Sequence, residues 1–299
     1  MLANAAAIQS AATGYRALFE RGRESVATFY TDYSMRVPSS GYAENYQIAP
    51  LGVTIREWKG DRRIHSAKLY DYTLVNADYE GTFSVPRNAF EDDRLGHFNA
   101  QAQQLGIEAA RHPDELLASL LSGGFASTDN LYGVAFFTNA MPTADGANNR
   151  DNLVSGGLTA AKFEEAYQLL EGMKAWNGKP INPIGLGQGV DLIVPPALRS
   201  TAEAIITAAL GTAGITNTNY QKARLVVNPY LTSNTAYFLA VRGAAMAPFI
   251  NQVRREHNLQ VMNNPESEDL FYRKRVVFGT DGRYALGYGC PELIVGSAG

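Results

Sequence analysis

Apolar residues near the start of the chain recur at helical spacing. Within residues 4–20 the apolar positions follow one another at steps of four, three and four: Ile8, Ala12, Tyr15 and Phe19. Because these steps place side chains on one face of an α-helix, the sequence predicts an N-terminal helix with a single buried face. The region that follows, to about residue 52, contains Pro38, Pro50 and scattered glycine and serine residues. This composition predicts an extended arm without packed elements.

An alternation of side chains typical of β-strands begins at residue 53. Residues 53–59 alternate, with Arg56 and Trp58 on one side of the predicted strand, and residues 79–85 alternate in the same way. The stretch between the two strands is rich in charged residues: Lys59, Asp61, Arg62, Arg63 and Lys68. The pattern predicts an extended hairpin over residues 53–86, with a charged tip and with Pro86 ending its second strand.

A second helical pattern is unusually long. Its apolar positions keep one phase on both sides of Pro113: Leu95, Phe98, Ala102, Leu105, Ala109, Leu116 and Leu120. We therefore expect one helix, bent near His112, that ends at Ser122–Gly124. The acidic run Glu91–Asp93 is expected in its first turn, where negative charge is favourable.

The rest of the chain alternates between predicted helices and strands. Loops precede Thr159, which is expected to cap a helix with a buried stripe: Phe163, Ala166, Tyr167, Leu170 and Met173. Residues 191–194 read as a buried strand that runs through two prolines into another helix, and further strands are expected at 223–231, 236–241 and 271–279. This alternation predicts a compact α/β unit over residues 140–265.

Composition excludes several classes of protein. The chain has 299 residues, 45% of them hydrophobic, and a net charge of -3, so no basic surplus indicates tight binding to nucleic acid. Its start has no basic segment before an apolar run, and no apolar run of 18 residues occurs anywhere, so neither a signal peptide nor a membrane-spanning helix is expected. The single cysteine, Cys290, is expected to be a buried structural residue.

Candidate catalytic chemistry is sparse. The four histidines are dispersed, no cysteine pair accompanies them, and no metal site is predicted. Gly185–Gly189 is weakly similar to a dinucleotide-binding loop, but it precedes a predicted strand instead of joining a strand to a helix. No catalytic residue or cofactor is predicted. An arm and a charged hairpin would expose backbone edges in a monomer, which favours contacts with neighbouring copies.

Several segments resemble one known family. Arg56–Trp58, the run Asn76–Asp93, the strand that starts at Asp191 and the ending around Gly287–Gly289 are similar to the Mu-like phage major head subunits. The similarity runs in order from about Met35 to the C-terminus. This chain departs from the family pattern in the loop after Phe137, which lacks the histidine-containing segment that the family would have there.

The resemblance implies an α+β fold of the tailed-phage major capsid type, known as the Hong Kong 97 type. Its parts would be an N-terminal arm (1–52), an extended loop (53–86), a peripheral domain with a long spine helix (87–139), an axial domain (140–265) and peripheral return strands (266–299). The extended loop would then lie over an adjacent subunit. The candidate contact residues are Arg56, Trp58, Lys59, Asp61, Arg62, Arg63 and Lys68.

The implied function is structural. Copies would form pentamers and hexamers that close into an icosahedral shell around double-stranded DNA, contacted without sequence specificity. Assembly would take place in the host bacterial cytoplasm, with a scaffold, a portal and possible decoration proteins as partners and without a membrane. Two other functions stay open. A tail-tube subunit would be mostly β, which the long helical stripe argues against, and a nucleotide-binding enzyme would depend on Gly185–Gly189 alone.

Overall fold

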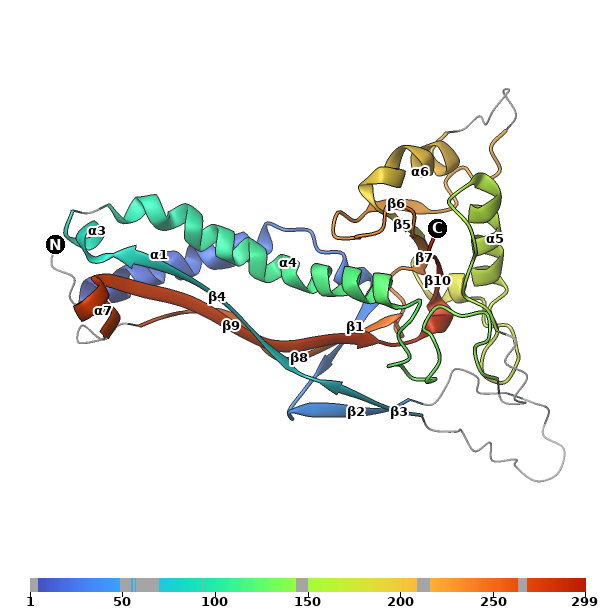
Figure 1. The fold of residues 1–299 in the computed structure, drawn as a ribbon, viewed down its shortest axis with the longest axis horizontal. Coiled ribbons are helices and arrows are strands. Elements are labelled where there is room, and N and C mark those ends of the chain that lie inside the picture. The colour runs from blue at the N-terminus through green and yellow to red at the C-terminus, as the bar shows by residue number, and fades with distance from the viewer. Residues whose placement is uncertain are drawn as a thin grey trace.

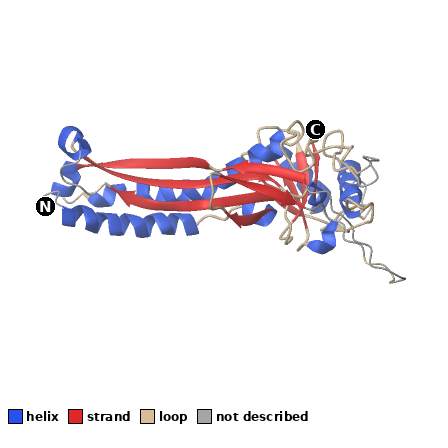
Figure 2. Ribbon diagram, turned by 90° about the horizontal axis from the view of Figure 1, so that it is seen from below, coloured by secondary structure: helices blue, strands red, loops and turns tan. Residues whose placement is uncertain are grey.

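The computed structural model shows a long body with a compact part at one end (Figures 1 and 2). The structure describes the following residues: 5–48, 55, 57, 70–92, 94–143, 150–208, 216–262 and 268–299. The long body consists of a twisted sheet with two helices along it, and the compact part holds a second sheet. This division places the chain in the α+β class, as predicted.

The long sheet has the strand order β1-β8-β9-β4. Its elements are β1 (Ser34–Pro38), β8 (Phe249–Val261), β9 (Arg275–Tyr288) and β4 (Ala77–Pro86). β8 and β9 are antiparallel and span most of the body, and β1 lies parallel to β8 with Ser34 opposite Phe249. The register of β8 against β9 shifts twice between Val253 and Asn258, so β8 contains irregularities of the β-bulge kind.

Two long helices lie along one face of this sheet (Figure 1). α1 (Ala5–Glu24) buries the predicted stripe of Ile8, Ala12, Tyr15 and Phe19, which confirms the N-terminal helix. α4 (Asn99–Gly123) is one unbroken α-helix that contains Pro113, which confirms the predicted continuity. The bend near His112 stays a prediction.

The start of the long helix was predicted incorrectly. The acidic run does not form its first turn, because Glu91 ends a separate short helix, α3 (Arg87–Glu91), and Asp92 is the C-cap residue of that helix. A 3-10 turn, η1 (Leu95–Phe98), precedes α4, whose own first turn has no acidic residue. The apolar phase from Leu95 onward therefore runs through two kinds of helix.

The compact sheet has the strand order β10-β7-β5-β6. Its strands are β5 (Val190–Val194), β6 (Arg224–Val227), β7 (Tyr237–Val241) and β10 (Ile294–Ser297), and all but β6 are buried along their length. α5 (Ala160–Glu171) and α6 (Arg199–Ile206) pack against it. The Thr159 side chain accepts a hydrogen bond from the Lys162 backbone N–H, which confirms the predicted cap.

The sheet pairings differ from the predicted boundary at residue 265. β8 lies within the range predicted for the compact unit, yet it is hydrogen-bonded to β9 and β1 in the long sheet. Conversely, β10, at the C-terminus, pairs with β7 in the compact sheet. Both sheets are therefore assembled from segments that lie far apart in the sequence.

The described hairpin pairs β2 (Ala43–Ile48) with β3 (Tyr70–Val75), and the predicted first strand, residues 53–59, lies outside the described residues except for Ile55 and Glu57. β2 and β3 are antiparallel, so the charged stretch does connect two antiparallel strands. Its first strand comes from the predicted arm, whereas the predicted second strand is β4, which pairs with β9 instead. The predicted arm is also not free of packed elements, because β1 belongs to the long sheet and α2 (Tyr30–Tyr33) precedes it.

The prediction of a strand over residues 271–279 was wrong for the first part of that range. Residues 271–273 belong to a short helix, α7 (Glu268–Arg273), and β9 starts at Arg275. Lys274 has φ of 51°, a left-handed conformation that separates the helix from the strand. Two further 3-10 turns, η2 (Pro183–Leu186) and η3 (Pro196–Leu198), flank β5, and η5 (Pro291–Leu293) precedes β10.

Candidate assembly surfaces

All seven predicted contact residues lie outside the described residues. They are Arg56, Trp58, Lys59, Asp61, Arg62, Arg63 and Lys68. The structure does describe the β2–β3 stem that carries them, together with the way in which that stem is attached to the body.

The β2–β3 stem is attached to the face of the long sheet opposite α4. The Gln252 side chain on β8 donates hydrogen bonds to the Leu74 carbonyl at 3.1 Å and to Asn76 Oδ1 at 2.8 Å, and it accepts one from the Tyr46 hydroxyl at 2.8 Å. A Cβ on Gly287 of β9 would lie 2.5 Å from the Tyr72 hydroxyl, so the stem approaches the sheet closely at this point. These contacts fix the base of the hairpin on the body.

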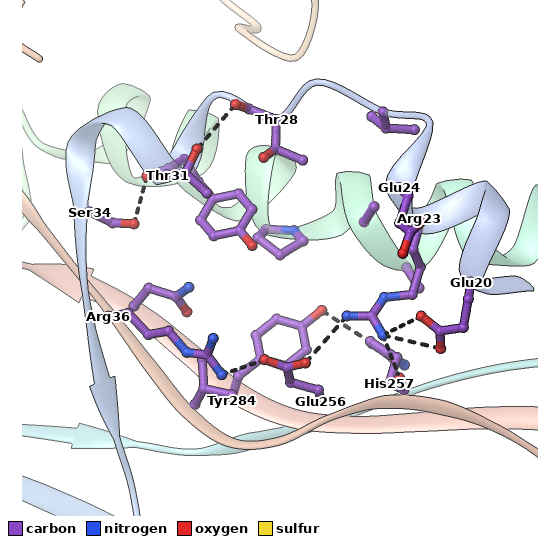
Figure 3. Close-up of a pocket in the computed structure, with 17 residues that line it drawn as sticks. Glu20, Arg23, Glu24, Thr28, Thr31, Ser34, Arg36, Glu256, His257 and Tyr284 are labelled. Atoms are coloured by element: carbon purple, nitrogen blue, oxygen red, sulfur yellow. Dashed lines mark hydrogen bonds and ion pairs between the residues drawn. The ribbon is translucent and has the colours of Figure 1, made fainter. Parts of the chain in front are cut away.

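A cavity of about 500 Å³ lies on the other face of the sheet (Figure 3). Its walls come from the end of α1, from α2 and β1, from α4, and from β8 and β9. Arg23 forms ion pairs with Glu20 at 3.2 Å and with Glu256 at 3.4 Å, and Glu256 also pairs with Arg36. The cavity therefore has a charged rim and reaches down to the buried face of β8.

Two histidines share one tyrosine hydroxyl beneath α4. The Tyr284 hydroxyl lies 2.6 Å from His112 Nδ1 and 3.4 Å from His257 Nε2. Burial lowers the pKa of both imidazoles, and the pKa of His257 is lowered further by the nearby His112 and Arg23. The two rings are therefore neutral near pH 7, and they act as packing and hydrogen-bonding groups between helix and sheet.

A buried carboxylate connects the N-terminal segment to the compact sheet. Asp191 on β5 is fully buried and accepts hydrogen bonds from the Tyr33 hydroxyl at 2.6 Å and from Arg224 at 2.6 and 3.0 Å. Arg242 adds a third contact at 3.2 Å. Because two arginines compensate its charge and Tyr33 donates a further hydrogen bond, this aspartate has a structural role and is not an exposed acid.

The glycine-rich stretch is explained by close packing. A Cβ on Gly187 would lie 2.3 Å from Val241 Cγ1 and 2.6 Å from the Arg242 carbonyl oxygen, and Gly189 has φ of 126°. The stretch leads into β5 and does not connect a strand to a helix, so it lacks the geometry of a dinucleotide-binding loop.

No group of three or more metal-ligating side chains occurs among the described residues, and none of their helices is long and apolar enough to cross a membrane. Cys290 is buried, and burial raises the pKa of its thiol. Exposed apolar side chains do occur, including the edge-to-face pair of Phe271 and Tyr272 on α7, which are 71% and 76% exposed.

Comparison with known proteins gives a consistent result. The family model described as "Mu-like prophage major head subunit gpT" matches residues 8–157, 152–231 and 232–299. The major capsid protein of Escherichia phage Mu is 26% identical over 299 residues, which cover 100% of this chain and 76% of that protein. The Mu-like prophage FluMu major head subunit of Haemophilus influenzae is 26% identical over 162 residues, 53% of this chain and 52% of that protein.

Solved structures show the same fold. The chain in the procapsid of bacteriophage JBD30 matches with a TM-score of 0.61 and 20% identity, over 98% of this chain and 75% of that chain. The matched families and structures are capsid proteins and not enzymes. The chain therefore belongs to the Mu-like prophage major head subunit family and has the tailed-phage major capsid fold of the Hong Kong 97 type.

Proposed function

We propose that copies of this chain assemble as rings of five and six that close into an icosahedral shell around double-stranded DNA. The observation that carries the proposal is the match of the whole chain to major head subunits, joined to an elongated body whose hairpin stem holds a charged segment. A subunit of this shape can contact several neighbours at once, and many weak contacts together give a stable shell. Assembly would take place in the host cytoplasm.

The two sheets suggest how the subunit is arranged within a ring. In this proposal the long sheet with α1 and α4 is the peripheral domain, residues 53–86 contain the extended loop, and the compact sheet is the axial domain. The sequence-based division at residue 265 then needs one adjustment, because β8 belongs to the peripheral sheet and β10 to the axial one. The N-terminal arm, proposed as residues 1–52, also contributes α1 and β1 to the peripheral domain.

The proposed partners follow from the same function. A scaffold and a portal would direct shell formation, decoration proteins are a further class of possible partner, and packaged DNA would touch the inner wall. With a net charge of -3 the chain has no cation surplus for strong phosphate neutralisation, so contact with DNA would be weak and independent of sequence.

Electron microscopy of the purified chain tests the proposed function. We expect rings or closed shells, formed by the chain alone or with its scaffold. Tubes would support a tail-tube subunit instead, and a protein that stays monomeric at high concentration in both conditions would contradict assembly.

A charge reversal tests the contact residues of the extended loop. The double substitution Arg62→Glu and Arg63→Glu should impair shell formation, most strongly at low salt where repulsion is least screened. The melting temperature of the unassembled subunit should stay nearly unchanged, because exposed charges contribute only about 0 to 1 kcal/mol each. The control, Arg62→Lys with Arg63→Lys, retains the charge and should assemble. Normal assembly of the Glu variant at every ionic strength would remove these two residues from the interface.

A further inference from the structure

A chain of hydrogen bonds connects the middle of α4 to the long sheet. His112 Nδ1 on α4 lies 2.6 Å from the Tyr284 hydroxyl on β9, and the same hydroxyl lies 3.4 Å from His257 Nε2 on β8. His257 Nδ1 in turn lies 3.3 Å from the Thr280 hydroxyl. Tyr284 and His257 are both buried, so these groups find their partners within the protein. We call His112, Tyr284 and His257 the histidine cluster.

Two neutral imidazoles suit this arrangement. The Tyr284 hydroxyl has one hydrogen to donate and can also accept, and each neutral imidazole has one N–H group and one acceptor nitrogen. The hydroxyl therefore donates to one histidine and accepts from the other. Because His112 faces it with Nδ1 and His257 with Nε2, both neutral rings must carry their proton on the same kind of nitrogen.

Two protonated imidazoles do not suit it. A protonated imidazole has two donors and no acceptor. One proton can be accommodated, because the charged ring donates to Tyr284 and the other ring stays an acceptor. With a second proton both rings would donate to the same oxygen, and the hydroxyl hydrogen would lose its acceptor. Two positive charges would then lie on either side of one hydroxyl group, in a buried place that disfavours charge.

The charged groups near the cluster do not compensate for two protons. Burial lowers the pKa of both imidazoles and is the largest cause for each. Glu115 on α4 and Asp281 on β9 oppose the shift, yet Glu115 is exposed and Asp281 is already paired with Arg255. Arg23 on α1 adds to the lowered pKa of His257 and donates to its backbone carbonyl at 3.2 Å.

The other groups around the cluster have partners of their own. The Tyr79 ring on β4 packs on His112, with ring centroids 4.3 Å apart. Glu256 on β8 is paired with two arginines on the cavity rim. Asp114 on α4 accepts hydrogen bonds from the backbone of α2, and its pKa is raised to about 6. Asp114 therefore titrates in the same pH range as histidine, and an experiment on the cluster has to exclude its contribution.

α4 is weakened at the same place. Pro113 follows His112 and has no N–H group, so the helix lacks the backbone hydrogen bond to the Ala109 carbonyl. The cavity on this side of the sheet is lined by Ala109, Pro113, His257 and Tyr284 (Figure 3). The contact between helix and sheet here thus depends on side chains, and the cavity gives water and protons a route to them.

We propose that the histidine cluster is an acid-sensitive switch that holds the middle of α4 on the long sheet. With neutral imidazoles the hydrogen bonds through Tyr284 keep α4 in contact with β8 and β9. When both imidazoles are protonated, these hydrogen bonds cannot all form, and the part of α4 around Pro113 separates from the sheet. The switch is a property of the single subunit and does not depend on the proposed assembly.

Hydrogen exchange of the full-length, unassembled subunit tests the switch. All proteins carry Asp114→Asn, so that this carboxyl does not contribute to the pH dependence. After correction for the intrinsic exchange rate, residues 105–119 should open about 30-fold more often at pH 5 than at pH 7.5 if opening takes up one proton, and up to about 1,000-fold more often if it takes up two. Peptides of α5, which has no histidine, should open equally often at both pH values. An equal opening of α4 at both pH values would overturn the proposal.

Glutamine variants test the two histidines. Glutamine can donate and accept hydrogen bonds but does not titrate. His112→Gln and His257→Gln should each show a smaller pH response in α4, and the double variant should show none. The matched control is His97→Gln, an exposed histidine in η1 just before α4, which should keep the full response. A full response in the double variant would assign the pH dependence to other groups and remove the histidines from the switch.

Nitrogen NMR of the histidine rings tests the geometry without any change in the cluster. Near neutral pH the rings of His112 and His257 should both be neutral, and both should carry the proton on Nδ1 or both on Nε2. On acidification, the second protonation should coincide with the opening of α4. A charged ring near neutral pH, or different tautomers in the two rings, would contradict the shared hydroxyl and overturn the proposal.

Discussion

Single buried polar residues connect segments that are distant in the sequence. Arg150 is fully buried and its guanidinium donates to Glu292 at 2.7 Å and to the backbone carbonyls of Pro142 and Lys174. The Tyr132 hydroxyl donates to the same glutamate at 2.5 Å. One guanidinium thus holds together the loop before α5, the turn after α5 and the segment before β10. Arg150 stabilises the subunit only when all of its partners are present, since a buried charge without a partner lowers the stability of the folded state.

Substitution of Arg150 tests this dependence. Arg150→Met should lower the free energy of unfolding by about 3 to 5 kcal/mol, because Glu292 would stay buried without a counter-charge. Adding Glu292→Met should restore part of the loss, since a neutral pair removes the desolvation cost. The exposed pair Arg199–Glu203 provides the control, and Arg199→Met should cost less than about 1 kcal/mol. Chemical denaturation of the unassembled subunits measures all four proteins, and equal losses at Arg150 and Arg199 would contradict the argument.

At the scale of elements, the packing of α1 on α4 depends on two glycines. A Cβ on Gly106 of α4 would lie 2.1 Å from the Phe19 carbonyl oxygen, and one on Gly22 of α1 would lie 2.2 Å from the Gln103 carbonyl oxygen. Backbone atoms cannot move aside as a flexible side chain can. The two helices must therefore separate if either glycine acquires a side chain.

The pair of glycines can be tested against a third, which lies in α1. Gly106→Ala should destabilise the subunit by about 1 to 3 kcal/mol, as overpacking does, and Gly22→Ala should act in the same direction. A Cβ on Gly14 of α1 would have nothing within 4 Å, so Gly14→Ala should stabilise the helix by up to about 1 kcal/mol. Thermal melting of the three variants decides, and a stabilising effect of Gly106→Ala would show that the helices are not in close contact.

A carboxylate on α4 holds the start of α2 and makes this contact dependent on pH. Asp114 Oδ1 accepts hydrogen bonds from the backbone N–H groups of Phe29 and Tyr30, both at 2.8 Å. Burial raises the pKa of this carboxyl to about 6, although the two N–H donors and Arg111 oppose the shift. In the unfolded chain an aspartate titrates near pH 4. The folded state therefore binds the proton more tightly, and this part of the stability is lost as the pH rises from about 4 to about 6.

Asp114→Asn isolates this contribution. The amide keeps the acceptor oxygen but does not titrate, so the free energy of unfolding of the native chain, relative to the variant, should fall by an amount on the order of 2 kcal/mol between pH 4 and pH 7. His112 and His257 have lowered pKa values and act with the opposite sign, but they are present in both proteins and cancel in the comparison. Denaturation curves at several pH values measure the difference. Parallel pH profiles would contradict the raised pKa of Asp114.

Elements with one uninterrupted period could be predicted from the sequence, and those with mixed periods could not. α1, α4 and α5 each bury one face at helical spacing, and β5 contains the apolar run Leu192–Val194, so local patterns were sufficient. β8 was missed because its first four residues are buried on both faces, while its second half has register shifts that break the alternation. The pairing of the strands could not be predicted either, since an alternating pattern identifies a strand but not the strand beside it.

The cavity beneath α4 could not be predicted for a related reason. Arg23, Arg36 and Glu256 on its rim belong to no motif, and they form ion pairs only after the chain has folded. Their proximity depends on how β8, β1 and α1 pack together. The charged hairpin segment, by contrast, stands out in the sequence because a concentration of basic residues needs no tertiary structure to be recognised.

At the scale of the whole molecule, the two sheets share one hydrophobic core. Adjacent phenylalanines in the loop after α4 connect them: Phe136 packs on Phe249 and Tyr288 of the long sheet, and Phe137 packs on Phe238 of the compact sheet. The centroids of the two rings lie 5.1 Å apart, in an edge-to-face arrangement. The two sheets therefore meet through aromatic side chains, and we expect the subunit to unfold as one cooperative unit.

Removing this aromatic contact should uncouple the sheets. Phe136→Ala together with Phe137→Ala should split the single unfolding transition of the unassembled subunit into two, because each sheet keeps its remaining core but loses the contact with the other. The control is Phe163→Ala in α5, an equally buried side chain that packs only within the compact part. It should lower the free energy of unfolding by about 3 to 5 kcal/mol, while the two sheets remain coupled.

Hydrogen exchange resolved by segment distinguishes the two variants. In the double variant, peptides from β5 and β7 should exchange at a different denaturant concentration from peptides of β8 and β9. In the control, the peptides of all four strands should exchange together. Simultaneous exchange in the double variant would show that the Asp191 contacts suffice to couple the sheets without the aromatic core.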